Sequence, residues 1–371
     1  MTSKERLLKI FKGEIPDRPA VKLMGAAPGQ KLLHPAYEPV YKLAMEKTDL
    51  MPRRESDFNL YFGADAEKFC HTVEKPTQSP AWVDQVTTVQ TPEGPLTQVF
   101  TISTANEPGY EKEYLLKEPD DIKKLLSIAY RPLPFSADEY FTIRDALADR
   151  GVANLVLDHV MYGLQRIIGP ENFALWSIEA RDLYIEAMQT FAERIRNHAI
   201  EAFKAGAGPL FGWVGPECCL PPMMSPGDFE DFVFNFDKPL IDLIHENGGY
   251  VWVHCHGKVG NFLKRFIDMG VNVLQPVEPP PMGDITLAEA FQKVGNKIAL
   301  EGNIENGALM EEDSRTIAEL VTEALQAGHG RRFILCPTAS YHNWPHPTKR
   351  YIENLITFIT HALRLVESSE R

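Results

Sequence analysis

Two histidines at alternate positions, His254 and His256, follow an apolar run of the chain. On an extended strand, residues i and i+2 point to the same side, so both imidazoles can bind one metal ion while Cys255 faces the opposite way. Zinc binds imidazole nitrogen and thiolate sulfur, and a catalytic zinc keeps an exchangeable position. Cys336 could complete such a site, with Glu217 as a fourth ligand that a substrate displaces. The alternatives are satisfied polar side chains at a strand end and, for Cys336, an ordinary buried thiol.

Polar side chains also follow other apolar runs. Asp158 and His159 come directly after the run 152–157 and could form an acid/base pair, or could cap a following helix. We assign catalytic roles to these two residues and to Glu217.

Residues expected to contact a substrate follow the same pattern. Glu278, Asn303 and Glu305 could line a pocket or cap helices. Aromatic side chains in the loops would suit an aromatic substrate, and the sequence is expected to place Tyr162, Trp213, Tyr341 and Trp344 there. The residues predicted to bind substrate are Tyr162, Glu278, Asn303, Tyr341 and His342.

The elements that carry these residues follow a regular order. From residue 152 onward, apolar β-branched runs alternate with amphipathic stretches, which indicates a parallel sheet covered by helices. With strands at 20–24 and within 50–110, the total comes to about eight, as a (β/α)8 TIM barrel requires. An open doubly wound sheet is the second choice, since the Gly-rich dinucleotide fingerprint is absent. The remaining strands are expected at 152–157, 209–214, 250–255, 271–275, 298–301 and 333–336, and the helices at 170–204, 226–247, 259–269, 287–294 and 312–327.

In such a barrel, chemistry takes place where strands end and βα-loops begin, and the residues above all fall at such ends. An N-terminal extension with a helix over 4–12 precedes the barrel. A β-rich excursion over 72–104 contains a hairpin signal, Thr91-Pro92-Glu93-Gly94-Pro95. We expect residues 1–371 to form a single barrel domain.

Composition excludes several classes of protein. The chain has 371 residues, and its net charge of −13 argues against a nucleic acid partner. No apolar run has the ~18–20 residues of a membrane span. The N-terminus has charges where a signal peptide would be apolar, and five cysteines are too few for a disulfide framework in a chain of this length. A cytoplasmic location is therefore expected.

Taken together, these residues identify a family resemblance. The chain resembles the uroporphyrinogen decarboxylase superfamily, and a further hairpin resembles the methyltransferase branch of that superfamily. The segments that carry the resemblance are Lys4-Glu5-Arg6-Leu7-Leu8 through Pro16-Asp17-Arg18-Pro19, Met224-Ser225-Pro226, Gly248-Gly249, His254 through Gly257, and, for the branch, Thr91-Pro92-Glu93-Gly94.

The resemblance implies a choice between two chemistries. Decarboxylases of the superfamily carry an N-terminal arginine-rich motif with a catalytic aspartate, and Pro52-Arg53-Arg54-Glu55 matches it poorly. The other branch transfers methyl groups to or from a corrinoid protein with zinc held by a His-x-Cys pair and a distant Cys. In this chain His254 and Cys336 align with the outer ligands, and His256 replaces the middle cysteine. A His2Cys zinc is more positive than a thiolate-rich one and better suited to polarising an oxygen.

The expected function is therefore zinc-dependent methyl transfer between a small substrate, such as a methyl ether, and a corrinoid (cobalamin) carried by a partner protein. Two alternatives stay open: a decarboxylase-like enzyme acting on a tetrapyrrole, and a non-catalytic corrinoid- or tetrapyrrole-binding protein. The resemblance leaves the oligomeric state open, although homodimers are common in the superfamily.

Overall fold

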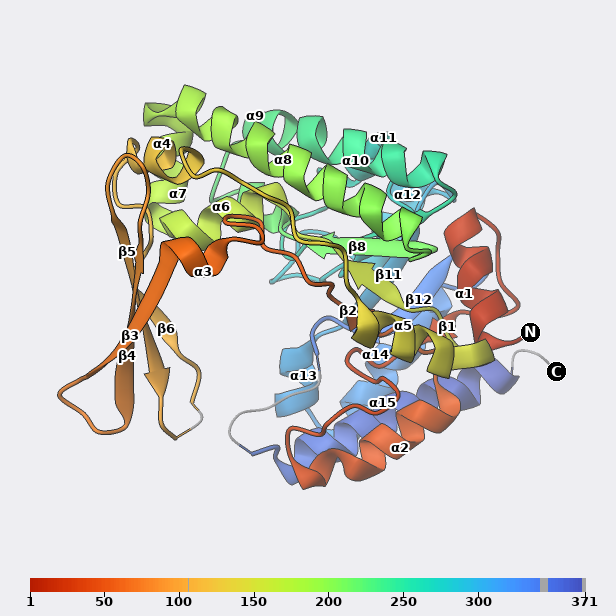
Figure 1. Ribbon diagram of the computed structural model, residues 1–371. Coiled ribbons are helices and arrows are strands. Elements are labelled where there is room, and N and C mark those ends of the chain that lie inside the picture. Colours follow the sequence, from red (N-terminus) through yellow and green to blue (C-terminus); the bar gives the residue numbers. More distant parts are fainter. Residues whose placement is uncertain (106, 341–345, 369–371) are drawn as a thin grey trace.

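The computed structural model describes residues 1–105, 107–340 and 346–368. Eight parallel strands form one curled sheet in the order β1-β12-β11-β10-β9-β8-β7-β2 (Figure 1). Their bounds are β1 Ala20–Val21, β2 Arg53–Arg54, β7 Asn154–Val156, β8 Leu210–Val214, β9 Tyr250–His254, β10 Val273–Gln275, β11 Ala299–Ile304 and β12 Phe333–Pro337.

The sheet closes on itself between its first two strands. The backbone N–H of Asp49, just before β2, donates to the carbonyl oxygen of Val21 on β1 at 2.7 Å. On the other side, Leu50 forms a parallel bridge with Gly151 ahead of β7. The predicted (β/α)8 barrel is thus confirmed. Most expected strands lie within about two residues of their observed bounds, but β1 ends three residues early, at Val21, and β11 continues to Ile304.

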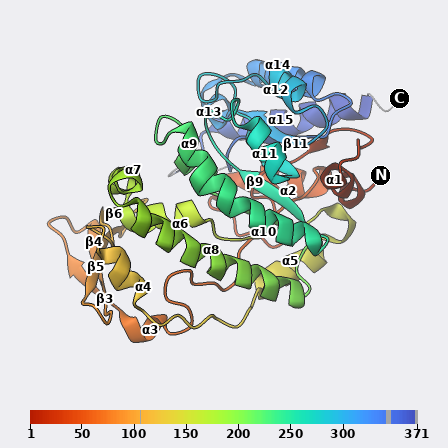
Figure 2. The same ribbon diagram turned by 90° about the horizontal axis from the view of Figure 1, so that it is seen from above.

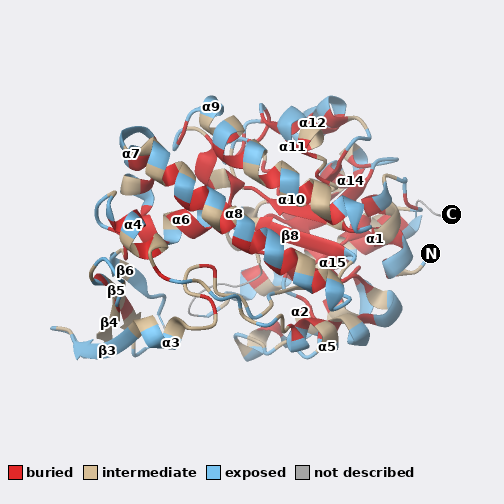
Figure 3. Ribbon diagram, turned by 45° about the horizontal axis from the view of Figure 1, so that its top comes forward, coloured by how far each residue is buried: buried red, intermediate tan, exposed pale blue. Residues whose placement is uncertain are grey.

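Helices surround the barrel, and the strands beneath them are buried (Figures 2 and 3). The helices after β7 are α6 Val160–Ile168, α7 Pro170–Glu179, α8 Arg181–Lys204, α9 Pro226–Phe229, α10 Asn235–Glu246, α11 Leu263–Met269, α12 Leu287–Val294, α13 Asn306–Glu311, α14 Ser314–Ala327 and α15 Lys349–Ser368. The earlier helices are α1 Ser3–Lys12, α2 Glu38–Lys47, α3 Ala66–Phe69, α4 Asp121–Leu126 and α5 Asp138–Leu147. Short 3₁₀ turns occupy η1 Pro35–Tyr37, η2 Ala148–Arg150 and η3 Pro216–Cys219.

Two of the expected long helices are interrupted. The stretch 170–204 breaks at Ala180 into α7 and α8. The stretch 226–247 starts as α9, widens into a π-helical turn over Glu230–Phe234 and continues as α10, which contains Pro239. Proline lacks an N–H and obstructs the preceding turn, so irregular hydrogen bonding near it is expected.

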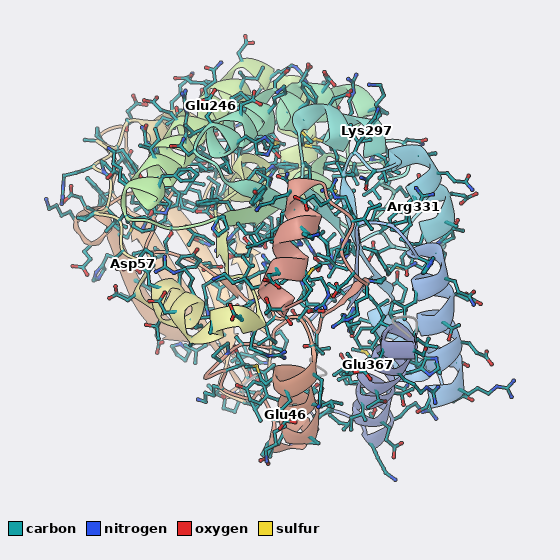
Figure 4. All side chains as sticks on the ribbon, turned by 90° about the vertical axis from the view of Figure 1, so that its right-hand side faces the viewer. Glu46, Asp57, Glu246, Lys297, Arg331 and Glu367 are labelled. Carbon is teal, nitrogen blue, oxygen red and sulfur yellow. The ribbon has the colours of Figure 1, made fainter. Side chains whose placement is uncertain are left out.

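The N-terminal helix α1 covers the amino end of the barrel, where it lies at the centre of Figure 4. Thr2 caps it and forms a reciprocal capping box with Glu5, and Gly13 ends it in the left-handed conformation. Its apolar face packs into the barrel end in a cluster with residues from the strands: Leu7, Ile10, Phe11, Ala20, Met51, Val152, Leu210, Trp252, Val273, Ala299 and Ile334. This end is closed by apolar packing.

The β-rich excursion forms a second, four-stranded antiparallel sheet that stands beside the barrel (Figure 1). Its strands are β3 Cys70–Pro76, β4 Trp82–Val89, β5 Leu96–Ser103 and β6 Tyr110–Glu113. The predicted hairpin at 91–95 joins β4 to β5, and the sheet extends beyond the expected 72–104 at both ends. Val89 and Leu96, at the hairpin end of this sheet, are buried in the main core, and Cys70 packs against it.

Candidate functional site

The two histidines of the His-x-His segment lie together at the carboxyl end of β9. Their ring centroids are 4.4 Å apart and the rings meet edge to face. His254 is buried, and its Nδ1 hydrogen bonds to the side-chain oxygen of Gln275 on the neighbouring β10. Burial, followed by the charge of His256, lowers the pKa of His254 to about 3. His254 is therefore a neutral imidazole at pH 7.

His256 is fixed by a carboxylate from the next βα-loop. Its Nδ1 lies 2.7 Å from Oε1 of Glu278, whose second oxygen accepts the Gly257 backbone N–H at 2.6 Å. Burial disfavours the charged ring, but the hydrogen bond and charge of Glu278 outweigh it, and the pKa of His256 is raised. Glu278 thus orients a histidine. Its two oxygens are used by His256 and Gly257, so it does not act as the helix cap that was one of its two expected roles.

Two further carboxyl groups face this pair. Burial raises the pKa of Glu217 although the Gly215 N–H donates to it at 3.0 Å. Burial and the charge of Glu278 raise the pKa of Glu305 to about 7. Both groups interact electrostatically with His256. The Oε1 atom of Glu305 is buried and has no hydrogen-bond partner in the described part of the chain, and its side chain makes no cap bond to α13.

The predicted pair Asp158 and His159 divides between two environments. His159 is buried and its Nε2 lies 3.0 Å from Oδ1 of Asp237 on α10. The other oxygen of Asp237 accepts the indole N–H of Trp213 at 3.0 Å. His159 precedes α6 but makes no side-chain cap bond, so the capping alternative fails for it. Burial raises the pKa of Asp158, against the opposing charge of Arg166.

The expected aromatic and amide contacts are only partly in place. Tyr162 is 39% exposed near the mouth, and Asn303 is half-buried on β11. Trp213 was expected in a loop, and that expectation is wrong: it is fully buried in β8, where it holds Asp237. Tyr341, His342 and Trp344 lie outside the described residues.

The Cys336 thiol lies against the Glu301 carboxylate of β11. This thiol is fully buried, and burial raises its pKa far above the ordinary value. Among the described residues, no group of three or more His, Cys, Asp or Glu side chains is arranged to hold a metal ion. The histidine pair does have the second-sphere partners of a metal site, Gln275 and Glu278.

A layer of buried charge lies beneath the histidines, and the sequence reasoning missed it. Lys22 and Glu301 form an ion pair of 2.5 Å with both side chains almost fully buried. The indole N–H of Trp252 donates to the second Glu301 oxygen at 2.9 Å, and the Arg53 guanidinium lies over that indole ring, 4.9 Å from its centroid. Lys22 and Glu301 each stand inside an otherwise apolar run of the sequence, and a charged residue in such a run could have indicated a buried ion pair.

A cavity of about 570 Å³ opens beside this layer, at the carboxyl ends of β1 and β2. It was not expected, because the Pro52-Arg53-Arg54-Glu55 segment was set aside as unlike the decarboxylase motif. The charged residues that line this cavity are Arg53, Arg54, Glu55, Asp57, Asp138 and Glu139.

Comparisons with known proteins agree with this architecture. Residues 162–346 match the model of the uroporphyrinogen decarboxylase (URO-D) family. A uroporphyrinogen decarboxylase from Trichodesmium erythraeum is 30% identical over 112 residues, which is 29% of this chain and 30% of that protein's length. A methyltransferase from Methanosarcina mazei has the same fold, with a TM-score of 0.62 at 16% identity over 97% of this chain and 98% of that one.

The segment that matches the uroporphyrinogen decarboxylase family, residues 162–346, is just under half of the chain. That segment carries the histidine pair, Glu217, Glu278 and Glu305. Across the described part of the chain, no helix has the length and apolar character needed to cross a membrane.

Proposed function

We propose that this protein is a methyltransferase that transfers a methyl group between an oxygen-bound methyl substrate, such as a methyl ether, and a corrinoid protein. The family match supports an enzyme with its site at the carboxyl ends of the strands. The Methanosarcina mazei methyltransferase supports the chemistry, since it shares the fold over nearly its whole length.

The observation that carries the proposal is the group of carboxyls around His256. Glu305 has a pKa of about 7, so it holds a proton in about half of the molecules at neutral pH, and none of the described residues hydrogen bonds to its Oε1. A general acid works best with a pKa near the operating pH. A group of this kind suits a reaction in which an oxygen leaves and must be protonated.

The proposed reaction breaks the methyl C–O bond, and the oxygen keeps the electron pair. The methyl carbon forms its new bond to the acceptor, and the leaving oxygen takes one proton, which Glu305 supplies. A corrinoid would supply the nucleophile that accepts the methyl group. Within the protein, His256 and Glu278 hold one wall of the site, and Glu217 lies near enough to interact with the same histidine.

Zinc at His254, His256, Cys336 and Glu217 stays a prediction. Elemental analysis of untagged protein tests it, with His256→Ala and Cys336→Ala alongside. About one zinc per chain, lost in both variants, would support the set; zinc that is retained in Cys336→Ala would exclude the thiol.

Methyl transfer is tested with free cob(I)alamin and a panel of methoxyarenes, by following the cobalamin spectrum. Wild type should methylate cob(I)alamin, and Glu305→Gln should lower the rate by about 10²-fold or more, because the amide cannot give up a proton. Glu319→Gln, an exposed glutamate on α14, is the matched control and should keep the wild-type rate. Folded protein that transfers no methyl group from any donor would refute the proposal.

A second candidate is decarboxylation of a tetrapyrrole. The family name and the placement of Arg53 at the barrel mouth favour it. The carboxyls around His256 oppose it, because a substrate with many carboxylates would be repelled there. Loss of CO2 from uroporphyrinogen with purified protein would establish this function in place of methyl transfer.

A further inference from the structure

The side chain of Arg53 stands out among the charged groups of the barrel mouth. Its guanidinium lies over the Trp252 ring, and among the described residues it forms no ion pair or side-chain hydrogen bond; its Nε is fully buried. Burial lowers its pKa from the ordinary arginine value, against the charges of Glu301, Glu55 and Glu217. A half-buried cation without a hydrogen-bonded partner is costly unless something else binds it.

The nearest buried carboxylate cannot serve as that partner. Both oxygens of Glu301 are engaged, one by the Lys22 ammonium at 2.5 Å and the other by the Trp252 indole N–H at 2.9 Å. His254 carries no charge to balance, since its pKa is about 3. The buried layer therefore contains two cations, Lys22 and Arg53, and one engaged carboxylate.

The cavity of about 570 Å³ has this arginine in its lining, and its charges are unevenly placed. The acidic members Glu55, Asp57, Asp138 and Glu139 are exposed, and Asp57 is labelled at the protein surface in Figure 4. Exposed charges are screened by water and salt, whereas a half-buried one is screened less. The positive charge of Arg53 thus acts on the interior of the cavity and the negative charges act on its outer lip.

The neighbouring arginine shows what an engaged guanidinium looks like in the same cavity. Arg54 donates from Nε to Glu139 at 2.7 Å and from a terminal nitrogen to Gln30 at 3.1 Å. Stacking on Trp252 uses the flat face of Arg53, and because Nε is buried, the donors left for a ligand are the in-plane N–H groups of its two terminal nitrogens. Two parallel N–H groups in one plane match the two oxygens of a carboxylate.

We propose that Arg53 binds a carboxylate of the substrate, so that the molecule processed at this mouth is a small organic acid, such as a methoxylated carboxylic acid. Arg53 acts electrostatically on His254, so it lies close to the histidine pair. A carboxylate on Arg53 would hold the rest of the substrate beside the residues proposed for methyl transfer. The inference rests on the proposed function only in placing the reaction at this mouth.

The test is binding without turnover, measured by titration calorimetry with 4-methoxybenzoate, methoxyacetate and the neutral matched ligand 4-methoxybenzamide. Wild type should bind the better of the two acids at least about tenfold more tightly than the amide, and Arg53→Gln should abolish this preference. Arg54→Gln, whose guanidinium is already engaged, should retain it within about twofold. Arg53→Lys keeps the positive charge but loses the two parallel N–H donors of the guanidinium, so part of the preference for acids should remain. If Arg53→Gln does not fold, this variant tests whether Arg53 binds the carboxylate.

Any of the following binding results would overturn the inference: wild type binds neither acid at millimolar concentration, it binds acid and amide with equal affinity, or Arg53→Gln and Arg54→Gln lose the preference for the acid to the same extent. A lower melting temperature in Arg53→Gln with unchanged ligand preference would give Arg53 a purely structural role and would also overturn it. No corrinoid or metal enters the measurement. An Arg53-dependent preference for acids together with failed methyl transfer would thus refute the proposed function alone.

Discussion

The two ends of the barrel are built from the same eight strands and differ in nearly every other respect. At the amino end, α1 packs Leu7, Ile10 and Phe11 against apolar strand residues. At the carboxyl end, the strands present Lys22, Arg53, His254, Gln275 and Glu301, followed by the carboxyls of the loops. One end contributes stability, and the other contains buried polar groups that must each find a partner.

The difference shows where this fold can carry function. Buried charges such as Lys22 and Glu301 add little net stability, because their mutual attraction offsets a large desolvation cost. The buried charges at the carboxyl end therefore add little to the stability of the fold, and the apolar packing at the amino end supplies it. Substitutions at the two ends should separate stability from activity.

Phe11→Ala at the amino end should have the largest effect on stability. Removing a fully buried ring leaves a cavity, and the free energy of unfolding should fall by about 3–5 kcal/mol. Denaturant unfolding measures the loss, and ligand binding at the other end should be unchanged in the folded protein. Lys12→Ala, exposed on the same helix, is the control. A changed ligand affinity in Phe11→Ala would show that the two ends are not independent.

Glu301→Gln should come next, with a loss of about 3 kcal/mol, because it leaves the Lys22 ammonium buried without a counter-charge. The double variant Lys22→Met with Glu301→Gln should recover much of that loss. A double-mutant cycle in denaturant separates the pair from its surroundings. Additive effects of the two substitutions would mean that the ion pair contributes no coupling.

The effect of Glu305 should appear in the pH dependence of stability. Its pKa rises from 4.5 to about 7 on folding, so between these values the folded protein binds more protons than the unfolded chain. This group therefore favours the folded state below about pH 4.5 and loses that contribution as pH rises to about 7. Stability curves of wild type and Glu305→Gln should diverge across this window, and parallel curves would contradict the shifted pKa.

Val73→Thr should have the smallest effect. Val73 is 41% exposed on the edge strand β3 of the separate sheet, and threonine keeps the β-branched shape. We expect a change of about 0.5 kcal/mol or less in the free energy of unfolding, and no change in methyl transfer. A large loss of activity with unchanged stability would show that this sheet takes part in function.

The sequence predicted the barrel well. Its strands are buried on both faces and so appear as continuous apolar runs, and the helices between them end at residues that typically stop helices. The runs at 250–255 and 333–336 were enough to place β9 and β12, and the resemblance placed the family. The excursion was predicted from its β-branched composition and its hairpin, although β6 lay outside the expected range. Local pattern alone sufficed for these elements.

The partners within the site could not be predicted in the same way. His256 was singled out from its spacing, but its contact with Glu278, like that of His159 with Asp237, joins residues from different βα-units. Trp213 was misplaced because an aromatic near a strand end can face either solvent or the core. Arg53 was not predicted as a site residue, because the segment around it matches the arginine-rich motif of the decarboxylases poorly. Its position at the end of β2 nevertheless brings it to the barrel mouth.

The sequence by itself determined the order of elements, the barrel and the residues at the strand ends, since these depend on periodicity and on short segments. Only the tertiary structure decided which of those residues meet: that Cys336 lies against Glu301, that Glu305 stands near His256, and that no described residue accepts a hydrogen bond from the Arg53 guanidinium. The physical reason is that side-chain direction, burial and charge pairing depend on strand register around a closed sheet, and no local pattern specifies that register.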